Sequence, residues 1–364
     1  MFLALKEIRD TKLKYGLLTG IILLIALVVF MLSGLAAGLS DGHKKAISDW
    51  DATGMVLNAS ANKIVNASSL AAKDLTKVSA DKVAAVGFYA GSLVKDETSA
   101  TKDNVSVFGA DSTAFVTPKV TTGKNFQENY QITIAKNLAT AEDLKVGDIV
   151  KIGNLAADLT VTGIFPTTTY SVEPVVYTNL ATYQALKYGA LPASDDEVTV
   201  NAFVFQADDW SKVLVTQSKE QTLEKISNQT FIENLPGYTA EKITLNLMIY
   251  VLIFIAAAVV GIFIYVLTLQ KKSLFGVLKA QGVPMGTMGR AIVFQGFLLS
   301  AVATILALFL TAALSLAFPS SMPFSLDWGT WLFSGSLLVM VATFAGLCSL
   351  PMIYKIDAVT AIGG

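Results

Sequence analysis

Residues 17–39 read LLTGIILLIALVVFMLSGLAAGL, a run of 23 residues without a single charged side chain. A helix needs about 20 apolar residues to cross the hydrocarbon core of a bilayer, so this stretch predicts a transmembrane helix. Three further uncharged runs meet the same requirement, at 243–269, 291–318 and 328–353. The chain is therefore predicted to be a membrane α-helical protein with four transmembrane helices.

Two other interpretations of these runs are weaker. The first run is longer than the apolar core of a cleaved signal peptide, about 7–15 residues, and no small-x-small cleavage site closes it. Four buried helices in a soluble protein would need a much larger polar surface around them. Only 15% of the 364 residues are charged, against about 25% in soluble domains.

The basic residues indicate the orientation in the membrane. Nine of them flank the apolar runs: Lys6, Arg9, Lys12, Lys14, Lys271, Lys272, Lys279, Arg290 and Lys355. The long segment 41–242 has 18 lysines but 24 acidic residues. The positive-inside rule then places both termini and the loop 270–290 in the cytoplasm. We expect a multi-pass protein of the plasma membrane with its large domain extracellular.

This large domain is predicted to be an α+β extracytoplasmic domain inserted between the first and second transmembrane helices. Short β-rich runs are separated by turn residues, and helical stretches are expected at 178–188 and 208–228. The full layout is as follows: interfacial helix 1–15, transmembrane helices 16–39, 243–269, 291–318 and 328–353, stalk and α+β domain 40–242, coupling loop 270–290, outer loop 319–327 and cytoplasmic tail 354–364.

Catalytic motifs are missing from the sequence. It contains no G-x-x-x-x-G-K-[ST] to hold ATP phosphates, no H-E-x-x-H and no G-x-S-x-G. The single histidine, His43, is expected to be a solvated residue of the stalk, and Asp195-Asp196-Glu197 a solvated turn. The net charge of −1 gives no sign of nucleic-acid binding. We therefore expect a non-catalytic protein with no metal site and no intrinsic cofactor.

The loop QKKSLFGVLKAQGVPMGTMGR at 270–290 predicts a short amphipathic helix that stops at Gly282 and Pro284. A cytoplasmic helix between two transmembrane helices has two interpretations. It lies in the membrane interface, or it docks its apolar face in a groove on a cytoplasmic partner.

This loop resembles the coupling region of the FtsX/MacB-like permeases, the type VII ABC transporter permeases. The similarity rests on a basic pair, a helix and an "lKA-G" pattern, and on the order of one helix, a large outer domain, three helices and a short tail. The residues matching the coupling region are Lys271, Lys272, Leu274, Phe275, Leu278, Lys279 and Gly282. The acidic partner usual in that loop is missing near Ser273 and Phe275.

The resemblance implies a homodimer that works with two copies of a separate cytoplasmic ABC ATPase, which binds and hydrolyses the ATP. Members of the family act by mechanotransmission: closure of the ATPase subunits moves the helices and the outer domains. Within the family, the chain length and the stretch from Ser48 to Leu70 are most similar to haem-exporting permeases of Gram-positive bacteria. Haem is then the expected transported ligand.

A haem exporter needs an apolar cleft with an axial ligand, and Met, His, Cys and Tyr are the usual ones. Met31 lies near the outer third of the first transmembrane helix and Glu241 at the outer start of the second. Met248 lies two turns below Glu241 on the same face. The haem-binding residues predicted on this basis are Met31, Glu241, Phe30, Tyr238, Met248 and Tyr250.

Three functions remain open at this point. The first is ATP-driven efflux of haem from the membrane through a homodimer cleft. The second is export of a peptide or antibiotic on the same scaffold. The third is a mechanotransmitter that regulates a cell-wall hydrolase and transports nothing.

Overall fold

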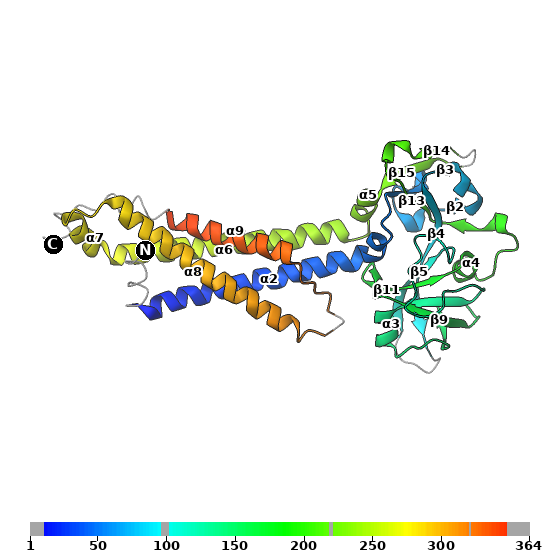
Figure 1. Cartoon of the computed structure of the whole chain (residues 1–364), viewed down its shortest axis with the longest axis horizontal. Helices are drawn as coiled ribbons and strands as arrows, with labels where there is room; N and C mark the ends of the chain where they lie inside the picture. Colours follow the sequence, from blue (N-terminus) through cyan, green and yellow to red (C-terminus); the bar gives the residue numbers. More distant parts are fainter. Residues whose placement is uncertain (1–10, 96–101, 218–220, 320–321, 348–364) are drawn as a thin grey trace. The chain divides into compact units, whose positions relative to one another are not determined.

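The computed structural model describes residues 11–95, 102–217, 221–319 and 322–347. The chain divides into two compact units, one formed by residues 1–38 and 241–364 and the other by residues 39–240 (Figure 1). The first unit contains the apolar helices and the second the inserted domain. Most of the expected interfacial helix at 1–15 and the whole tail at 354–364 lie outside the described residues.

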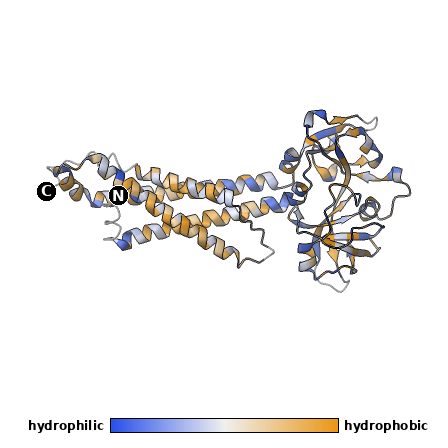
Figure 2. Cartoon of the chain, in the orientation of Figure 1, coloured by the Kyte–Doolittle hydropathy of each residue, from blue (hydrophilic) through white to orange (hydrophobic). Residues whose placement is uncertain are grey.

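Four described helices are long and apolar enough to cross a membrane, which confirms the predicted fold class. They are α2 (Lys12–Asp49), α6 (Tyr238–Gln270), α8 (Met285–Ser315) and α9 (Trp328–Leu347). Figure 2 shows that most of their residues are hydrophobic. Helices suit these runs because every backbone N–H and C=O in lipid must find its partner within the segment. Helix α2 continues past Leu39 to Asp49.

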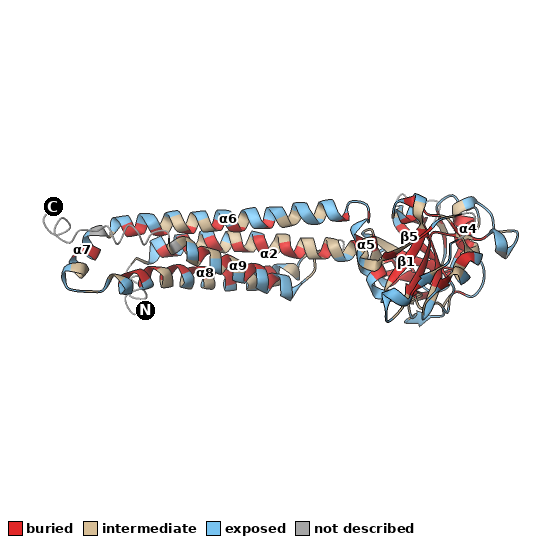
Figure 3. Cartoon of the chain, turned by 90° about the horizontal axis from the view of Figure 1, so that it is seen from above, coloured by how far each residue is buried: buried red, intermediate tan, exposed pale blue. Residues whose placement is uncertain are grey.

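The transmembrane unit has its own core, in which buried positions alternate with exposed ones along α2 and α6 (Figure 3). The face of α8 that packs inward carries small residues at Gly296, Ser300, Ala303 and Ala307. Small residues allow helix backbones in a membrane to approach closely. They explain why α8 and α9 form the closest helix pair of the unit.

The loop between α8 and α9 is held against two glycines of α2. Ser325 N–H donates to the Gly34 carbonyl at 3.0 Å. A Cβ at Gly34 would overlap the ring of Phe324, and one at Gly38 would overlap the backbone of Pro323. Only glycine at both positions leaves room for this loop, so the outer part of α2 is joined to the α8–α9 hairpin by backbone contact.

The inserted domain is built on one sheet of 11 strands in the order β10-β11-β7-β9-β8-β4-β13-β1-β15, with β5 pairing both β11 and β4, and β6 pairing β9. The strands of this sheet are β1 (Gly54–Asn58), β4 (Lys82–Val94), β5 (Asp103–Gly109), β6 (Thr122–Gly123), β7 (Gln131–Ala135), β8 (Ile149–Ile152), β9 (Leu159–Phe165), β10 (Thr169–Tyr170), β11 (Glu173–Thr178), β13 (Ala202–Gln206) and β15 (Leu223–Ser227). Two-residue strands form two small ribbons, β2 (Leu70–Ala71) with β12 (Thr199–Val200) and β3 (Val78–Ser79) with β14 (Leu214–Val215). The helices are α3 (Lys136–Ala141), α4 (Leu180–Tyr188) and α5 (Asn228–Glu233).

Strand β4 joins the two halves of this sheet. Its first residues pair with β13, and its remaining residues pair with β5 and β8. At the junction, the buried Asn201 accepts from the backbone N–H of Phe88 at 2.8 Å and from the Tyr183 hydroxyl at 2.6 Å. The Asn201 amide in turn donates to the carbonyls of Val65 and Ser68. A fully satisfied buried amide of this kind stabilises one arrangement of the strands.

An aromatic core fills the domain next to the outer end of α2. Trp50 follows α2 directly and its Nε1 donates to the Tyr177 hydroxyl at 2.7 Å. Its ring lies edge-on to those of Phe88 and Phe108, with centroids 6.1 and 5.4 Å away. Ala46 and other residues of the last turns of α2 belong to the same buried cluster. The end of α2 is therefore part of the core of the inserted domain.

Two expectations about this domain are wrong. The helix expected at 208–228 is instead a 3-10 turn at Trp210–Lys212 followed by β14 and β15. Strand β15 forms there because it pairs with β1 while Leu223 and Ile226 enter the core. His43 is not solvated: it is 9% exposed, and its ring packs edge-on against Tyr238. Asp196 and Glu197 are exposed, as expected for a turn.

Candidate functional site

The cytoplasmic loop contains the expected short helix, α7 (Lys272–Ala280), and its end is specified by the sequence. Gly282 adopts a φ of +81°, its N–H donates to the Lys279 carbonyl, and the Val283 N–H donates to the Leu278 carbonyl, both at 3.0 Å. This pair of bonds is a Schellman motif, which requires a left-handed residue after the helix. Pro284 then starts α8. The sharp turn sets the direction of α7 relative to α8.

The structure divides the predicted coupling residues between two faces of α7. Phe275 is buried in the transmembrane core, and Leu278 packs against that core from the side. Leu274 and Val277 are exposed, at 50% and 39%. These two residues lie three apart and therefore share one face. The exposed apolar surface of α7 is formed by Leu274 and Val277, whereas Phe275 packs into the bundle.

A polar network connects this loop to the start of α2 and to α8. Lys271 Nζ donates to the Tyr15 hydroxyl at 3.1 Å, and that hydroxyl donates to Gln295 Oε1 at 3.3 Å. Tyr15 and Gln295 are both buried. Burial lowers the pKa of Lys271 to about 8, so the ammonium is still charged at neutral pH. Sequence analysis missed Tyr15 and Gln295, because nothing in their local pattern separates them from ordinary residues near a membrane boundary.

Replacing Tyr15 by phenylalanine should lower the free energy of unfolding by about 1–3 kcal/mol, since two hydrogen bonds of roughly 1 kcal/mol each disappear. Thermal unfolding of the protein in lipid nanodiscs would measure the loss. Tyr250→Phe is the matched control, because this tyrosine is exposed on α6. Equal melting temperatures for the two variants would contradict a structural role for the Tyr15 hydroxyl.

Among the exposed apolar residues of α6 and α2 are two sets whose members lie seven positions apart. On α6 these are Met248, Ile255, Ile262 and Leu269. Glu241, half-buried in the first turn of α6, continues the series outward. On α2, the exposed Leu17 and Leu24 are followed seven residues later by the half-buried Met31. A repeat of seven keeps one face of a helix toward a partner helix.

The other predicted haem residues lie elsewhere. Phe30 is buried in the bundle, with its ring centroid 5.5 Å from that of Trp331. Tyr250 is exposed but lies two positions after Met248, so it is on another face of α6. Tyr238 is buried in the inserted domain, where its hydroxyl is 3.1 Å from Ser40 Oγ. Within one transmembrane unit, Glu241 and Met248 share a face, while Phe30 and Tyr250 do not belong to it.

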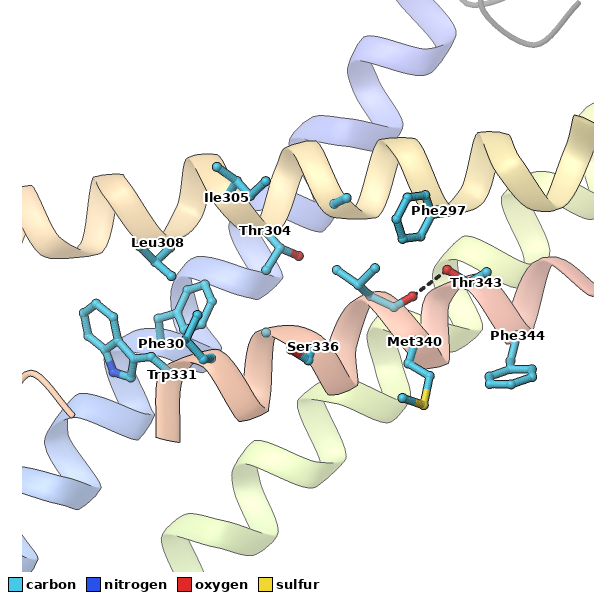
Figure 4. Close-up of a pocket in the computed structure, with 14 residues that line it drawn as sticks. Phe30, Phe297, Thr304, Ile305, Leu308, Trp331, Ser336, Met340, Thr343 and Phe344 are labelled. Atoms are coloured by element: carbon cyan, nitrogen blue, oxygen red, sulfur yellow. Dashed lines mark hydrogen bonds between the residues drawn. The ribbon is translucent and has the colours of Figure 1, made fainter. Parts of the chain in front are cut away.

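A groove between α8 and α9 was not expected from the sequence. It has a volume of about 590 Å³ and lies above Phe30 and Trp331, with Thr304, Ser336 and Met340 among its walls (Figure 4). Neither Met31 nor Glu241 belongs to the residues that line it. The groove results from the way α8 and α9 pair, and no local sequence pattern indicates this pairing.

Two family models match this chain and together cover both units. Residues 17–228 match the MacB-like periplasmic core domain, and residues 246–358 match the FtsX-like permease C-terminal domain. The chain belongs to the FtsX/MacB-like family of ABC transporter permeases. The permease is accordingly a protein of the plasma membrane with a large extracytoplasmic domain, and it belongs to a system that includes an ABC ATPase.

Relatives of this permease include proteins whose names propose a role in hemin transport. The permease protein HrtB of a proposed hemin transport system of Staphylococcus haemolyticus is 27% identical over 364 residues, covering 100% of this chain and 99% of that protein. Its namesake in Staphylococcus epidermidis strain RP62A is 27% identical over 371 residues, with the same coverage. An uncharacterized ABC transporter permease of Mycobacterium tuberculosis strain H37Rv is 24% identical over 297 residues, which cover 80% of this chain and 78% of that protein.

Among solved structures, the periplasmic region of MacB from Actinobacillus actinomycetemcomitans is 15% identical, with a TM-score of 0.34 over 51% of this chain and 94% of that one. The extracellular domain of the transporter YknZ from Gram-positive bacteria is also 15% identical, with a TM-score of 0.31 over 44% of this chain and 86% of that one.

Proposed function

We propose that the permease exports haem from the membrane as a homodimer, driven by two copies of its partner ATPase. The observation that carries this proposal is the position of Met31, Glu241 and Met248. All three lie at the outer ends of the seven-residue series on α2 and α6. Full-length similarity to permeases named for hemin transport supports haem as the cargo.

The two series suit pairing of α2 and α6 with the same helices of a second copy. A twofold axis makes such a contact self-complementary. It would bring two copies of Met31 and two of Glu241 around one cleft.

The chemistry of the cleft fits haem. A methionine thioether is an accepted axial ligand of haem iron, and Met31 lies roughly 12 Å below Leu39 at 1.5 Å per residue. Glu241 is an ionisable group at the membrane edge, where a carboxylate is costly if it faces lipid. A carboxylate facing a cleft that admits water avoids that cost.

Energy coupling follows from the two ends of α2. The Tyr15 network joins α2 to the loop that carries α7, and Trp50 fixes the other end of α2 in the extracytoplasmic domain. ATP binding shifts the permease from one state to the other if the complex binds ATP more tightly in one of them. Closure of the ATPase subunits then moves the helices. Mechanotransmission along α2 is then the means of opening the cleft.

We predict that purified permease binds one haem per dimer and that Met31→Ala weakens haemin binding about tenfold, equivalent to 1.4 kcal/mol. The Soret band should shift, because thioether ligation is lost. Titration with haemin, followed by absorption spectroscopy, measures both effects. Glu241→Ala should reduce the tolerance of cells to haem without reducing the amount of permease.

Met340→Ala is the matched control, because Met340 is an exposed transmembrane methionine on α9. It should bind haemin like the wild type. Unchanged spectra and affinity in both Met31→Ala and Glu241→Ala would show that this site is wrong. If the wild type binds no haemin, export of a peptide or antibiotic replaces haem export as the proposed function.

A further inference from the structure

The groove between α8 and α9 is long and narrow. Its lining on α9 extends from Trp331 to Phe344, about 20 Å at 1.5 Å per residue. Several of its rim residues, including Ile305, Leu332 and Phe344, are exposed toward the lipid side. A bilayer leaflet contributes about half of the ~30 Å hydrocarbon core. The groove is therefore slightly longer than the hydrocarbon thickness of one leaflet, about 15 Å.

Two polar atoms at the outer part of this groove have no hydrogen-bond partner in the part of the chain that the structure describes. They are Trp331 Nε1 and Thr304 Oγ1, and both side chains are more than nine-tenths buried. Figure 4 shows the Thr304 hydroxyl directed into the space between α8 and α9. A threonine in a helix usually satisfies its hydroxyl on the preceding turn, as Thr343 does on Val339. Thr304 is an exception to this pattern. Its hydroxyl and the Trp331 N–H therefore point to a ligand that carries an acceptor oxygen.

The Trp331 ring is held in place on three sides. The ring centroids of Phe30, Trp328 and Phe324 lie 5.5, 5.8 and 6.2 Å from it. Trp331 is one turn into α9 from Trp328, at the depth where tryptophans gather at the membrane interface. Thr304 is close to Gly335, one turn deeper than Trp331, because a Cβ on that glycine would lie 3.2 Å from the Thr304 methyl group. Trp331 therefore lies near the level of lipid ester groups, and Thr304 lies about one turn deeper.

Within the part of the chain that the structure describes, the lining contains no Asp, Glu, Lys, Arg or His. A haem with two carboxylates would meet no cation there and only one candidate iron ligand, Met340. A neutral ester suits the lining better, because its carbonyl oxygen has two lone pairs and accepts from two donors.

We propose that the groove binds one acyl chain of a membrane glycerolipid, with the ester carbonyl accepting hydrogen bonds from Trp331 Nε1 and the Thr304 hydroxyl. The chain lies along the groove between α8 and α9 and fills the space that their side chains leave open. This lipid site is separate from the cleft proposed for haem and does not rest on that proposal.

Quenching of tryptophan fluorescence by brominated lipid tests the site, because bromine quenches only at short range. The permease is reconstituted in phosphatidylcholine with either plain or dibrominated acyl chains. The contribution of Trp331 is the quenching lost in Trp331→Phe. Ser336→Phe should reduce this contribution by more than half, since it adds a ring at the rim of the groove. Leu306→Phe is the matched control, because Leu306 is exposed but does not line the groove.

The hydrogen bonds have their own test in ether-linked brominated phosphatidylcholine, which has no ester carbonyl. Quenching of Trp331 should be weaker in the ether lipid than in the ester lipid, and Thr304→Val should reduce this difference. Equal quenching in Ser336→Phe and Leu306→Phe would overturn the proposal. A second result would also overturn it: haemin displaces the brominated lipid, and Ser336→Phe loses haemin binding. The groove would then be a site for the cargo. If the permease binds no haemin but gives the expected results with the brominated lipids, haem export is contradicted and the lipid site is supported.

Discussion

Replacing Leu274 by aspartate should abolish stimulation of the partner ATPase while leaving the permease folded and inserted. Leu274 is half exposed on the face of α7 that points away from the bundle, next to Val277. A carboxylate buried without a partner in a docking groove costs several kcal/mol, and each 1.4 kcal/mol weakens an association tenfold. Co-purification with the ATPase and the rate of ATP hydrolysis are the measurements.

Ser273→Asp is the matched control for this experiment. It adds the same charge to an exposed position of α7 without removing apolar surface. We expect it to keep most of the stimulation. If Leu274→Asp co-purifies with the ATPase as well as the wild type does, α7 is not the docking helix, and its exposed face lies instead in the membrane interface.

Trp50→Ala should destabilise the extracytoplasmic domain by about 3–5 kcal/mol, the usual cost of removing a large aromatic side chain from a core. Trp50 is 4% exposed, contacts Phe88 and Phe108, and donates to Tyr177. Hydrogen exchange in β4 and β5 of the full-length protein would measure the effect. Trp50→Phe keeps most of the contacts and should cost only about 1 kcal/mol for the lost hydrogen bond.

Trp210→Ala provides the comparison for Trp50. Trp210 is 37% exposed and lies beneath the ammonium of Lys225, 4.5 Å from its ring centroid. Its loss should have a smaller effect, because less of its surface leaves water on folding. Equal exchange rates in the two alanine variants would contradict the view that the end of α2 belongs to the core of the domain.

The transmembrane helices were predictable because their signal is local. An uncharged run such as 17–39 must be a helix if it lies in lipid, whatever surrounds it. Several strands were predictable for a similar reason: Leu159–Phe165 alternates buried and less buried residues, as its composition suggests. The end of α7 was marked by Gly282 and Pro284, and the structure places a turn with a positive φ there.

Features that depend on pairing were not predictable. Strand β4 reads KVAAVGFYAGSLV, and its alanines and glycines give a weak strand signal although it is the centre of the sheet. Gly87 and Gly109 lie where the Tyr183 ring leaves no room for a Cβ. The pattern of α7 likewise placed Phe275 and Leu278 on the helix without showing that they face the bundle. Met31 and Glu241 were chosen for their ligand chemistry and their depth, and their role in haem binding stays a prediction.

The glycines at 34 and 38 limit how α2 can move. The loop at Pro323–Ser325 occupies the space of two absent side chains, and Ser325 is bonded to the Gly34 carbonyl. At its other end, α2 is bonded through Tyr15 to Lys271 and Gln295. Because these two sets of contacts hold α2 to the same helix bundle at two points, they oppose rotation of α2 about its axis and sliding along it. In the mechanism that we propose, α2 would therefore tilt together with α8 and α9, as a stiff lever arm whose fulcrum lies in the helix bundle.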